Sequence, residues 1–176
     1  LGLLHMPFSE DVGGLGGDGT DLMIIMQALG RGLVPEAYLF GLVMPGQLLA
    51  LCANPTQQER WLAPLLEGDH QLAFAWQEQN ARYDAFDIST QASQQESQWQ
   101  LNGRKDVVIN LDSAAATLVT AQLPSGKIGL FIVPTNTRGT TVRSYRTMDD
   151  QRAGDLTLNN VTLPLENCLS EDAGDA

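Results

Sequence analysis

The chain has 176 residues, which is enough for one full domain or two small ones. Its formal net charge of -11 argues against a nucleic-acid partner, because such partners are bound by clustered Lys and Arg. No apolar run approaches the roughly 20 residues of a membrane span. No basic segment is followed by an apolar one, as in a signal peptide, so we expect a cytoplasmic protein.

The cysteines and histidines form no reactive or metal-binding pattern. Cys52 and Cys168 stand alone, without a C-x-x-C spacing or a nearby His, which favours two reduced thiols. His5 and His70 are the only histidines, and they lie too far apart in the sequence to suggest a metal site. We therefore expect no metal.

Residues 1–70 have helical periodicity. Thr20 or Asp21 can cap a helix whose apolar residues between Leu22 and Leu29 follow the i, i+3, i+4, i+7 pattern. Pro35 suits the first turn of a second helix that runs toward Leu51.

Two further signals complete the predicted helical part. Pro45 and Gly46 should kink or loosen the second helix. Thr56 and Glu59 have the spacing of a capping box, which predicts a third helix ended by Gly68.

Residues 71–176 read as short, evenly spaced strands. The predicted strands are Leu72–Trp76, Ile88–Ala92, Gln98–Leu101, Lys105–Ile109, Thr117–Gln122, Ile128–Pro134, Val142–Tyr145 and Asp155–Leu158. Between two of them, Asn102-Gly103 is a strong hairpin signal, because both residues tolerate positive φ. Helices followed by strands predict an α+β fold, with an N-terminal helical segment before an antiparallel β-barrel or β-sandwich middle domain. The predicted domains are 1–70, part of a helical domain, and 71–176, the β-barrel.

Common catalytic motifs give no candidate. Gly14–Gly19 (GLGGDG) matches G-x-G-x-x-G by letter, but no strand is predicted before it and Asp18 would repel a phosphate, so we interpret it as the lead into a helix. The chain lacks G-x-S-x-G. The adjacent carboxylates Glu10-Asp11 and Asp149-Asp150 are typical of solvated loops. We assign no catalytic residue.

Two segments in order carry a resemblance to a known family. LAFAWQEQNARYD, Leu72–Asp84, resembles the acyl-CoA dehydrogenase signature A-[YF]-x-x-T-E-P-x-A-G-S-D. LNGRKDVVIN, Leu101–Asn110, resembles the hairpin that follows in that family, x-N-G-x-K-x-[WF]-[IV]-T-N-G. Leu1–Leu4, with Pro7, Glu10 and Gly13–Gly16, is similar to the family's opening segment. The resemblance covers nearly the whole chain.

The resemblance implies a flavoprotein of fatty acid metabolism. Members of the family use FAD to oxidise an acyl-CoA to the 2,3-enoyl-CoA, with a carboxylate that removes a C2 proton while a hydride passes from C3 to the flavin. They have an N-terminal helical domain, a β-barrel and a C-terminal helical bundle that carries the base in most members. This chain corresponds to most of the first part and to the second. The implied partners are an acyl-CoA substrate, further subunits in a homo- or hetero-oligomer (dimer or tetramer), and an electron-transfer flavoprotein.

Carried over by position, the resemblance assigns seven site residues. The residues implied to contact FAD are Phe74, Trp76, Gln77, Val107 and Ile109, and those implied to contact substrate are Arg82 and Tyr83. Several depart from the family pattern, which has Thr, Gly and Ser where this chain has Gln77, Arg82 and Tyr83. Val107 replaces an aromatic residue that shields the flavin, and Ile109 replaces a Thr.

These departures leave two readings open. In the first, the chain is the front part of an active flavin enzyme with an unusual site. In the second, it belongs to a degenerate scaffold subunit of a hetero-oligomeric acyl-CoA dehydrogenase, whose partner supplies the base and shares or replaces the FAD site.

Overall fold

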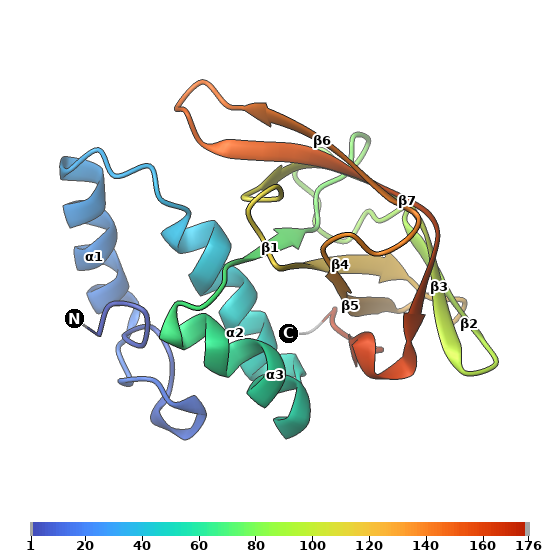
Figure 1. Ribbon diagram of the computed structural model, residues 1–176, viewed down its shortest axis with the longest axis horizontal. Helices are drawn as coiled ribbons and strands as arrows, with labels where there is room; N and C mark the ends of the chain where they lie inside the picture. The colour runs from blue at the N-terminus through green and yellow to red at the C-terminus, as the bar shows by residue number, and fades with distance from the viewer. Residues whose placement is uncertain (1, 175–176) are drawn as a thin grey trace.

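The computed structural model describes residues 2–174, so Leu1 of the opening motif lies outside the described residues. Helices come first in the chain and strands follow, as Figure 1 shows. The helices are α1 (Gly19–Arg31), a π-helical segment (Tyr38–Val43), α2 (Met44–Cys52) and α3 (Pro55–Glu67). The predicted α+β class is confirmed. No helix in the described range is both long and apolar enough to cross a membrane.

The helix starts differ from the predicted ones by two or three residues. Asp18 caps α1 in a capping box with Asp21, rather than Thr20 or Asp21 acting as the cap. Asn54 caps α3 in a box with Gln57, so the predicted Thr56–Glu59 box is wrong. The reason is Pro55, whose fixed φ and missing N–H suit the first helical position and begin the helix before Thr56. Gly68 ends α3 in the left-handed conformation, as predicted.

The second predicted helix is two segments of different pitch. Pro35 precedes the π-helical segment instead of opening a helix, so that prediction was wrong. Pro45 lies in the first turn of α2, which continues directly from the π-helical segment, so its missing N–H leaves one helical hydrogen bond unmade at this junction. The predicted loosening near Pro45 is thus a change from π- to α-helical geometry at Met44.

The strands form one mixed, mostly antiparallel sheet of eight strands. They are β1 (Leu72–Ala75), β2 (Gln91–Gln95), β3 (Gln98–Ile109), β4 (Ala116–Gln122), β5 (Ile128–Pro134), β6 (Thr140–Arg146), β7 (Arg152–Pro164) and β8 (Cys168–Ser170). Their order is β6-β7-β3-β2-β4-β5-β8, with β1 beside β4. The sheet departs from the predicted antiparallel arrangement at β1, which pairs with β4 in parallel. The long stretch of chain between β1 and β4 is what permits parallel pairing.

The Asn102-Gly103 hairpin prediction is wrong, because both residues lie inside β3. The turn between β2 and β3 is at Glu96-Ser97, and Glu96 has a φ of 50°. Gly103 is required for another reason: a Cβ at that position would lie 2.4 Å from the Thr90 hydroxyl oxygen. Asn102 accepts a hydrogen bond from the Asn160 N–H at 2.7 Å, where the β3–β7 register shifts. The Asn-Gly pair thus marks an irregularity between strands and not their connection.

The loop from Gly13 to Gly17 leads into α1, and residues 2–12 before it contain no strand, so the interpretation of the G-x-G-x-x-G match is confirmed. A Cβ at Gly14 would lie 2.0 Å from the Phe8 carbonyl oxygen. The glycine is therefore a packing requirement of the loop.

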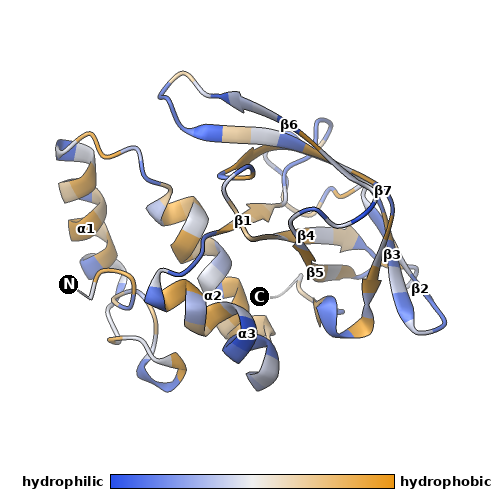
Figure 2. Ribbon diagram, in the orientation of Figure 1, coloured by the Kyte–Doolittle hydropathy of each residue, from blue (hydrophilic) through white to orange (hydrophobic). Residues whose placement is uncertain are grey.

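Two hydrophobic cores share the central strands. Along β4 and β5, residues alternate between a cluster enclosed by the sheet, which contains Phe131, and a cluster against the helices, which contains Leu118 and Leu130. Strands buried on both faces read as continuous apolar runs, and in Figure 2 hydrophobic colour lies on α1 and α2 as well as on strands of the sheet. Trp99 packs edge-on against Phe131 with ring centroids 5.1 Å apart, inside the sheet.

Asn54→Ala should lower the free energy of unfolding by about 1 kcal/mol, because it removes a helix cap. Thr56→Ala, the matched control inside α3, should have a smaller effect because its side chain caps nothing. Urea denaturation of both variants measures the difference. Equal losses would contradict the assigned helix start.

Candidate flavin half-site

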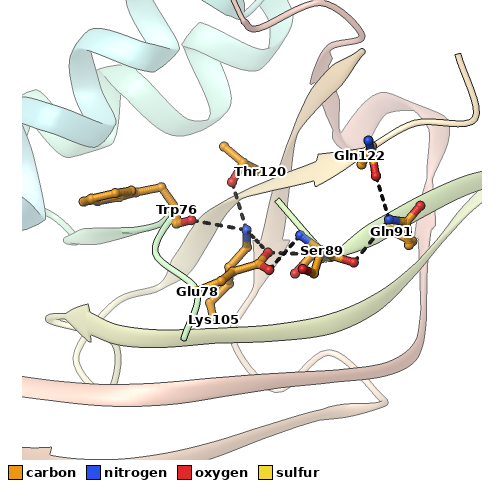
Figure 3. A network of polar contacts seen from close by, with 8 residues as sticks. Trp76, Glu78, Ser89, Gln91, Lys105, Thr120 and Gln122 are labelled. Atoms are coloured by element: carbon orange, nitrogen blue, oxygen red, sulfur yellow. Dashed lines mark hydrogen bonds and ion pairs between the residues drawn. The ribbon is translucent and has the colours of Figure 1, made fainter. Parts of the chain in front are cut away.

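A buried ion pair joins β3 to the segment after β1. The Lys105 ammonium donates to Glu78 Oε1 at 2.8 Å and to the Thr120 hydroxyl at 3.0 Å. It also reaches the Trp76 carbonyl oxygen at 3.4 Å, as Figure 3 shows. Lys105 is fully buried and Glu78 is 6% exposed. The segment carrying the signature is therefore fastened to the sheet interior by a charge pair.

The Glu78 carboxylate is also held from the chain that follows it. Its oxygens accept the backbone N–H groups of Ser89 at 2.8 Å and Thr90 at 3.0 Å. Burial raises the pKa of Glu78, but the hydrogen bonds from Lys105 and Thr90 and the charge of Lys105 outweigh it, so the pKa lies below its ordinary value. Burial lowers the pKa of Lys105, and Glu78 opposes that shift. The pair closes the loop from Glu78 to Thr90 into a fixed shape.

Beside this pair lies an apolar cavity of about 300 Å³. It brings together three of the predicted site residues, Phe74, Trp76 and Tyr83. In Figure 3 the Trp76 ring points away from the ion pair. The other lining residues are Met44, Leu48, Ala85, Phe86, Thr120, Ile128, Leu130, Ala173 and Gly174. Aromatic rings and aliphatic side chains supply most of the cavity lining, which suits a flat or an apolar ligand.

The remaining predicted residues lie outside this cavity. Ile109 lines a separate hollow of about 260 Å³ with Arg146 and Arg152. Val107 is 43% exposed on β3, and Arg82 is exposed on the loop beside Tyr83. Gln77 is half-buried, and its carbonyl oxygen accepts the Asp106 N–H at 2.9 Å. The structure therefore brings three of the seven predicted site residues into one cavity and places the other four outside it.

Two of the departures from the family pattern occupy unfavourable backbone positions. Arg82 and Val107 both have a φ of 52°, a left-handed conformation that side chains rarely adopt. It is least favourable for a β-branched residue such as Val. Each such residue costs on the order of 1–2 kcal/mol, so the surrounding contacts must hold it in place.

The structure adds residues that the sequence reasoning did not assign to the site. Lys105 and Thr120 support it from β3 and β4, and Met44, Leu48 and Phe86 form much of the cavity wall. Lys105 and Glu78 each stand among polar neighbours in the sequence, so no local pattern marks them as a buried pair. Within residues 2–174, no cluster of His, Cys, Asp and Glu could hold a metal ion.

Comparison with known protein families identifies the family to which the chain belongs. A family model described as "Acyl-CoA dehydrogenase, N-terminal domain" matches residues 1–69, and one described as "Acyl-CoA dehydrogenase, middle domain" matches residues 73–161. The chain belongs to the acyl-CoA dehydrogenase family. The resemblance predicted from the two segments is thereby confirmed.

Relatives of this acyl-CoA dehydrogenase family chain are full-length proteins about twice as long. Acyl-CoA dehydrogenase FadE12 of Mycobacterium tuberculosis is 29% identical over 184 residues, covering 98% of this chain and 47% of the relative. The chain thus spans about half the length of the curated relatives it matches. What it covers is the N-terminal and middle domains.

Solved structures show the same fold. A glutaryl-CoA dehydrogenase of Mycobacterium smegmatis in complex with FADH2 superposes with a TM-score of 0.85 at 25% identity, covering 98% of this chain and 46% of that one. The ChsE4-ChsE5 complex of Mycobacterium tuberculosis gives a TM-score of 0.85 at 26% identity, covering 96% and 44%. The first of these relatives holds a flavin, and the second is an assembly of two named components.

Lys105→Met should lower the free energy of unfolding by about 3–5 kcal/mol, because it leaves Glu78 buried without its charge partner. Lys127→Met, which removes the exposed ion pair with Asp172, is the matched control and should cost at most about 1 kcal/mol. Denaturant unfolding of both variants gives the comparison. Equal losses of unfolding free energy in the two variants would contradict a special stabilising role of the buried Lys105–Glu78 pair.

The ion pair also predicts an acid dependence of stability. Because the pKa of Glu78 is lower in the folded protein, its stabilisation is complete above the ordinary value of 4.5 and is lost as the pH falls through the folded value. The double variant Glu78→Gln/Lys105→Met should therefore lose less stability than the wild type between neutral pH and pH 3, roughly one unit below the ordinary Glu pKa. Thermal unfolding against pH measures this, and parallel curves would contradict it.

Proposed function

We propose that this chain forms the front half of an FAD-dependent acyl-CoA dehydrogenase, with 1–70 and 71–176 as its helical and β-domains. The observation that carries the proposal is the apolar cavity, in which Phe74, Trp76 and Tyr83 meet directly beside the Lys105–Glu78 pair. In this proposal Phe74 and Trp76 lie along the flavin, and Tyr83 borders the acyl group. Bound FAD would supply the hydride acceptor for 2,3-oxidation of an acyl-CoA thioester.

The donors around the cavity fit a planar ring that carries a pyrophosphate. Within the described residues, the Gln77 side-chain amide makes no hydrogen bond and the Arg82 guanidinium makes no ion pair. Gln77 can therefore donate to the edge of a flavin ring, and Arg82 can pair with a phosphate of the cofactor or of CoA. Local donors of this kind are needed, because the net charge of -11 repels an anionic ligand at long range.

The reaction also needs a base that this cavity does not contain. None of the described residues that line it carries a carboxylate. The proposed enzyme therefore takes its base from elsewhere in the assembled protein. In this proposal only the assembled protein is catalytically active. The acyl-CoA binds between this half-site and the part of the assembly that carries the base.

Further subunits are part of the proposal. Helix α1 has no buried residue and exposes Met23 and Ile24 by 61% and 57%. Exposed large apolar side chains next to one another mark contact surfaces. We propose a dimer or tetramer, homo- or hetero-oligomeric, with an electron-transfer flavoprotein as redox partner. The two-component ChsE4-ChsE5 complex is a relative that assembles from different chains.

A second candidate is a scaffold subunit without a complete FAD site of its own. It is favoured by the backbone at Arg82 and Val107, which carries costly side chains at a φ of 52°, and by Tyr83, whose exposure is 94%. An absorbance spectrum of the purified protein, alone and with its partner subunit, separates the candidates. Flavin retained by a homo-oligomer supports the enzyme, and flavin present only with the partner supports the scaffold.

Restoring the family residues should strengthen flavin binding. Val107→Trp with Ile109→Thr adds a stacking and a polar contact, each worth on the order of 1 kcal/mol. The dissociation constant for FAD should fall roughly ten- to thirtyfold. Flavin fluorescence titration measures it, with Val142→Trp as control because Val142 is 44% exposed, like Val107. Equal effects of the two tryptophans would argue against a flavin face at Val107.

A further inference from the structure

β3 contains a bulge at Asp106 and Val107. Lys105 pairs with Leu156 of β7 and Val108 pairs with Gly154, so these two residues face the single residue Asp155. An extra residue in one strand bends it and redirects its side chains. Here the bulge turns Val107, one of the residues proposed to contact flavin, into its left-handed conformation.

Asp155 accepts hydrogen bonds from three different directions. Its Oδ2 accepts from Arg104 Nη2 at 3.0 Å, and its Oδ1 accepts from the Tyr145 hydroxyl at 2.9 Å. The same Oδ1 accepts the Val107 N–H at 3.4 Å. The Asp155 side chain is only 12% exposed, so this carboxylate is not a solvated surface charge.

The neighbouring strand and the bulge itself hold this carboxylate in place. Tyr145 comes from β6, and burial together with Asp155 raises the pKa of its phenol, which therefore stays protonated as a donor. Arg104 also binds Asp106 Oδ1 at 2.8 Å. Three strands, β3, β6 and β7, thus converge on one carboxylate opposite the bulge.

The other side of the bulge contacts the signature segment. The Asp106 N–H donates to the Gln77 carbonyl oxygen at 2.9 Å, and the Lys105 ammonium reaches the Trp76 carbonyl oxygen at 3.4 Å. The bulge therefore lies between Asp155 on one side and Gln77 on the other. A shift of the bulge would move Val107 relative to Gln77.

We propose that Asp155 is a positioning residue which, held by Tyr145 and Arg104, fixes the Asp106–Val107 bulge against Gln77 and so sets the geometry of the flavin-facing surface. The proposal rests on the proposed function for its consequence, since it concerns residues assigned there to flavin. Its structural part, the restraint of Val107 by a residue of another strand, can be tested without any flavin.

The test compares Asp155→Ala, Asp155→Asn and Tyr145→Phe with Glu166→Gln. The last variant neutralises another carboxylate that pairs with an Arg, Arg60 of α3, at 3.9 Å. Hydrogen–deuterium exchange of the full chain reports on the amides of Lys105–Ile109, with those of β4 and β5 as an internal reference. FAD titration of the same samples reports on the site.

Asp155→Ala should speed exchange at Asp106–Val108 at least tenfold without changing β4 and β5. It should also weaken FAD binding at least fivefold. Asp155→Asn keeps an oxygen for the Val107 N–H and should restore part of both losses, Tyr145→Phe should cause intermediate changes, and Glu166→Gln should cause none. A β3 unchanged by Asp155→Ala overturns the proposal, and so does equal acceleration in β4 and β5, which would indicate a merely stabilising role.

Flavin binding that stays the same while the bulge loosens overturns the positioning role. A wild-type protein that takes up no FAD, alone or with its partner, contradicts the proposed function instead. In that case the exchange comparison still decides whether Asp155 holds the bulge.

Discussion

The charge pair between Lys105 and Glu78 is the interaction on which the rest of the site depends. It lies where the sheet interior meets the segment that leaves β1. Besides binding each other, Lys105 binds the Thr120 hydroxyl and Glu78 accepts the Ser89 N–H. An ion pair so far from water is held only when its remaining donors and acceptors are satisfied. Here the backbone N–H groups of Ser89 and Thr90 and the Thr120 hydroxyl satisfy them. The path of the chain from Trp76 to Thr90 follows from that requirement.

This arrangement separates two roles within one signature. Glu78 and Lys105 are buried and hold the frame, while Trp76 and Tyr83 line the cavity and Gln77 lies half-buried outside it. Residues of the second kind can change without unfolding the protein. That explains how a chain can keep the architecture of acyl-CoA dehydrogenases while Gln77, Arg82 and Val107 depart from the family pattern. In the proposed function, these departures fall on the surface that faces the ligand.

The bulge in β3 links these two roles. Lys105 precedes it and belongs to the frame, whereas Val107 within it belongs to the exposed surface. Asp155 and Gln77 contact it from opposite sides. We infer that the bulge at Asp106 and Val107 is held in place by contacts with the sheet interior. These contacts would also fix the position of Val107, whose backbone is strained.

Much of the fold could be predicted from local patterns. Helical periodicity before residue 70 and alternating strands after it gave the α+β class, and β5 was predicted with its observed bounds, because burial repeats with the period of each element. Helix starts were missed by two or three residues, since Asp18, Asn54 and Thr56 are all competent caps and only the position of Pro55 favours Asn54. The Asn-Gly pair was misread because a close approach of Thr90 to Gly103 requires glycine as strictly as a turn does.

The sequence by itself determined the family and the order of helices and strands, and it predicted the segments proposed to bear the site. It did so because strand and helix periods and ordered motifs are properties of neighbouring residues. Only the tertiary structure decided that Glu78 pairs with Lys105, that Phe74, Trp76 and Tyr83 share one cavity while Ile109 lies in another, and that Asp155 faces the bulge. The contact from Val107 to Asp155 joins residues 48 positions apart, and its register is set by strand pairing that no local pattern specifies.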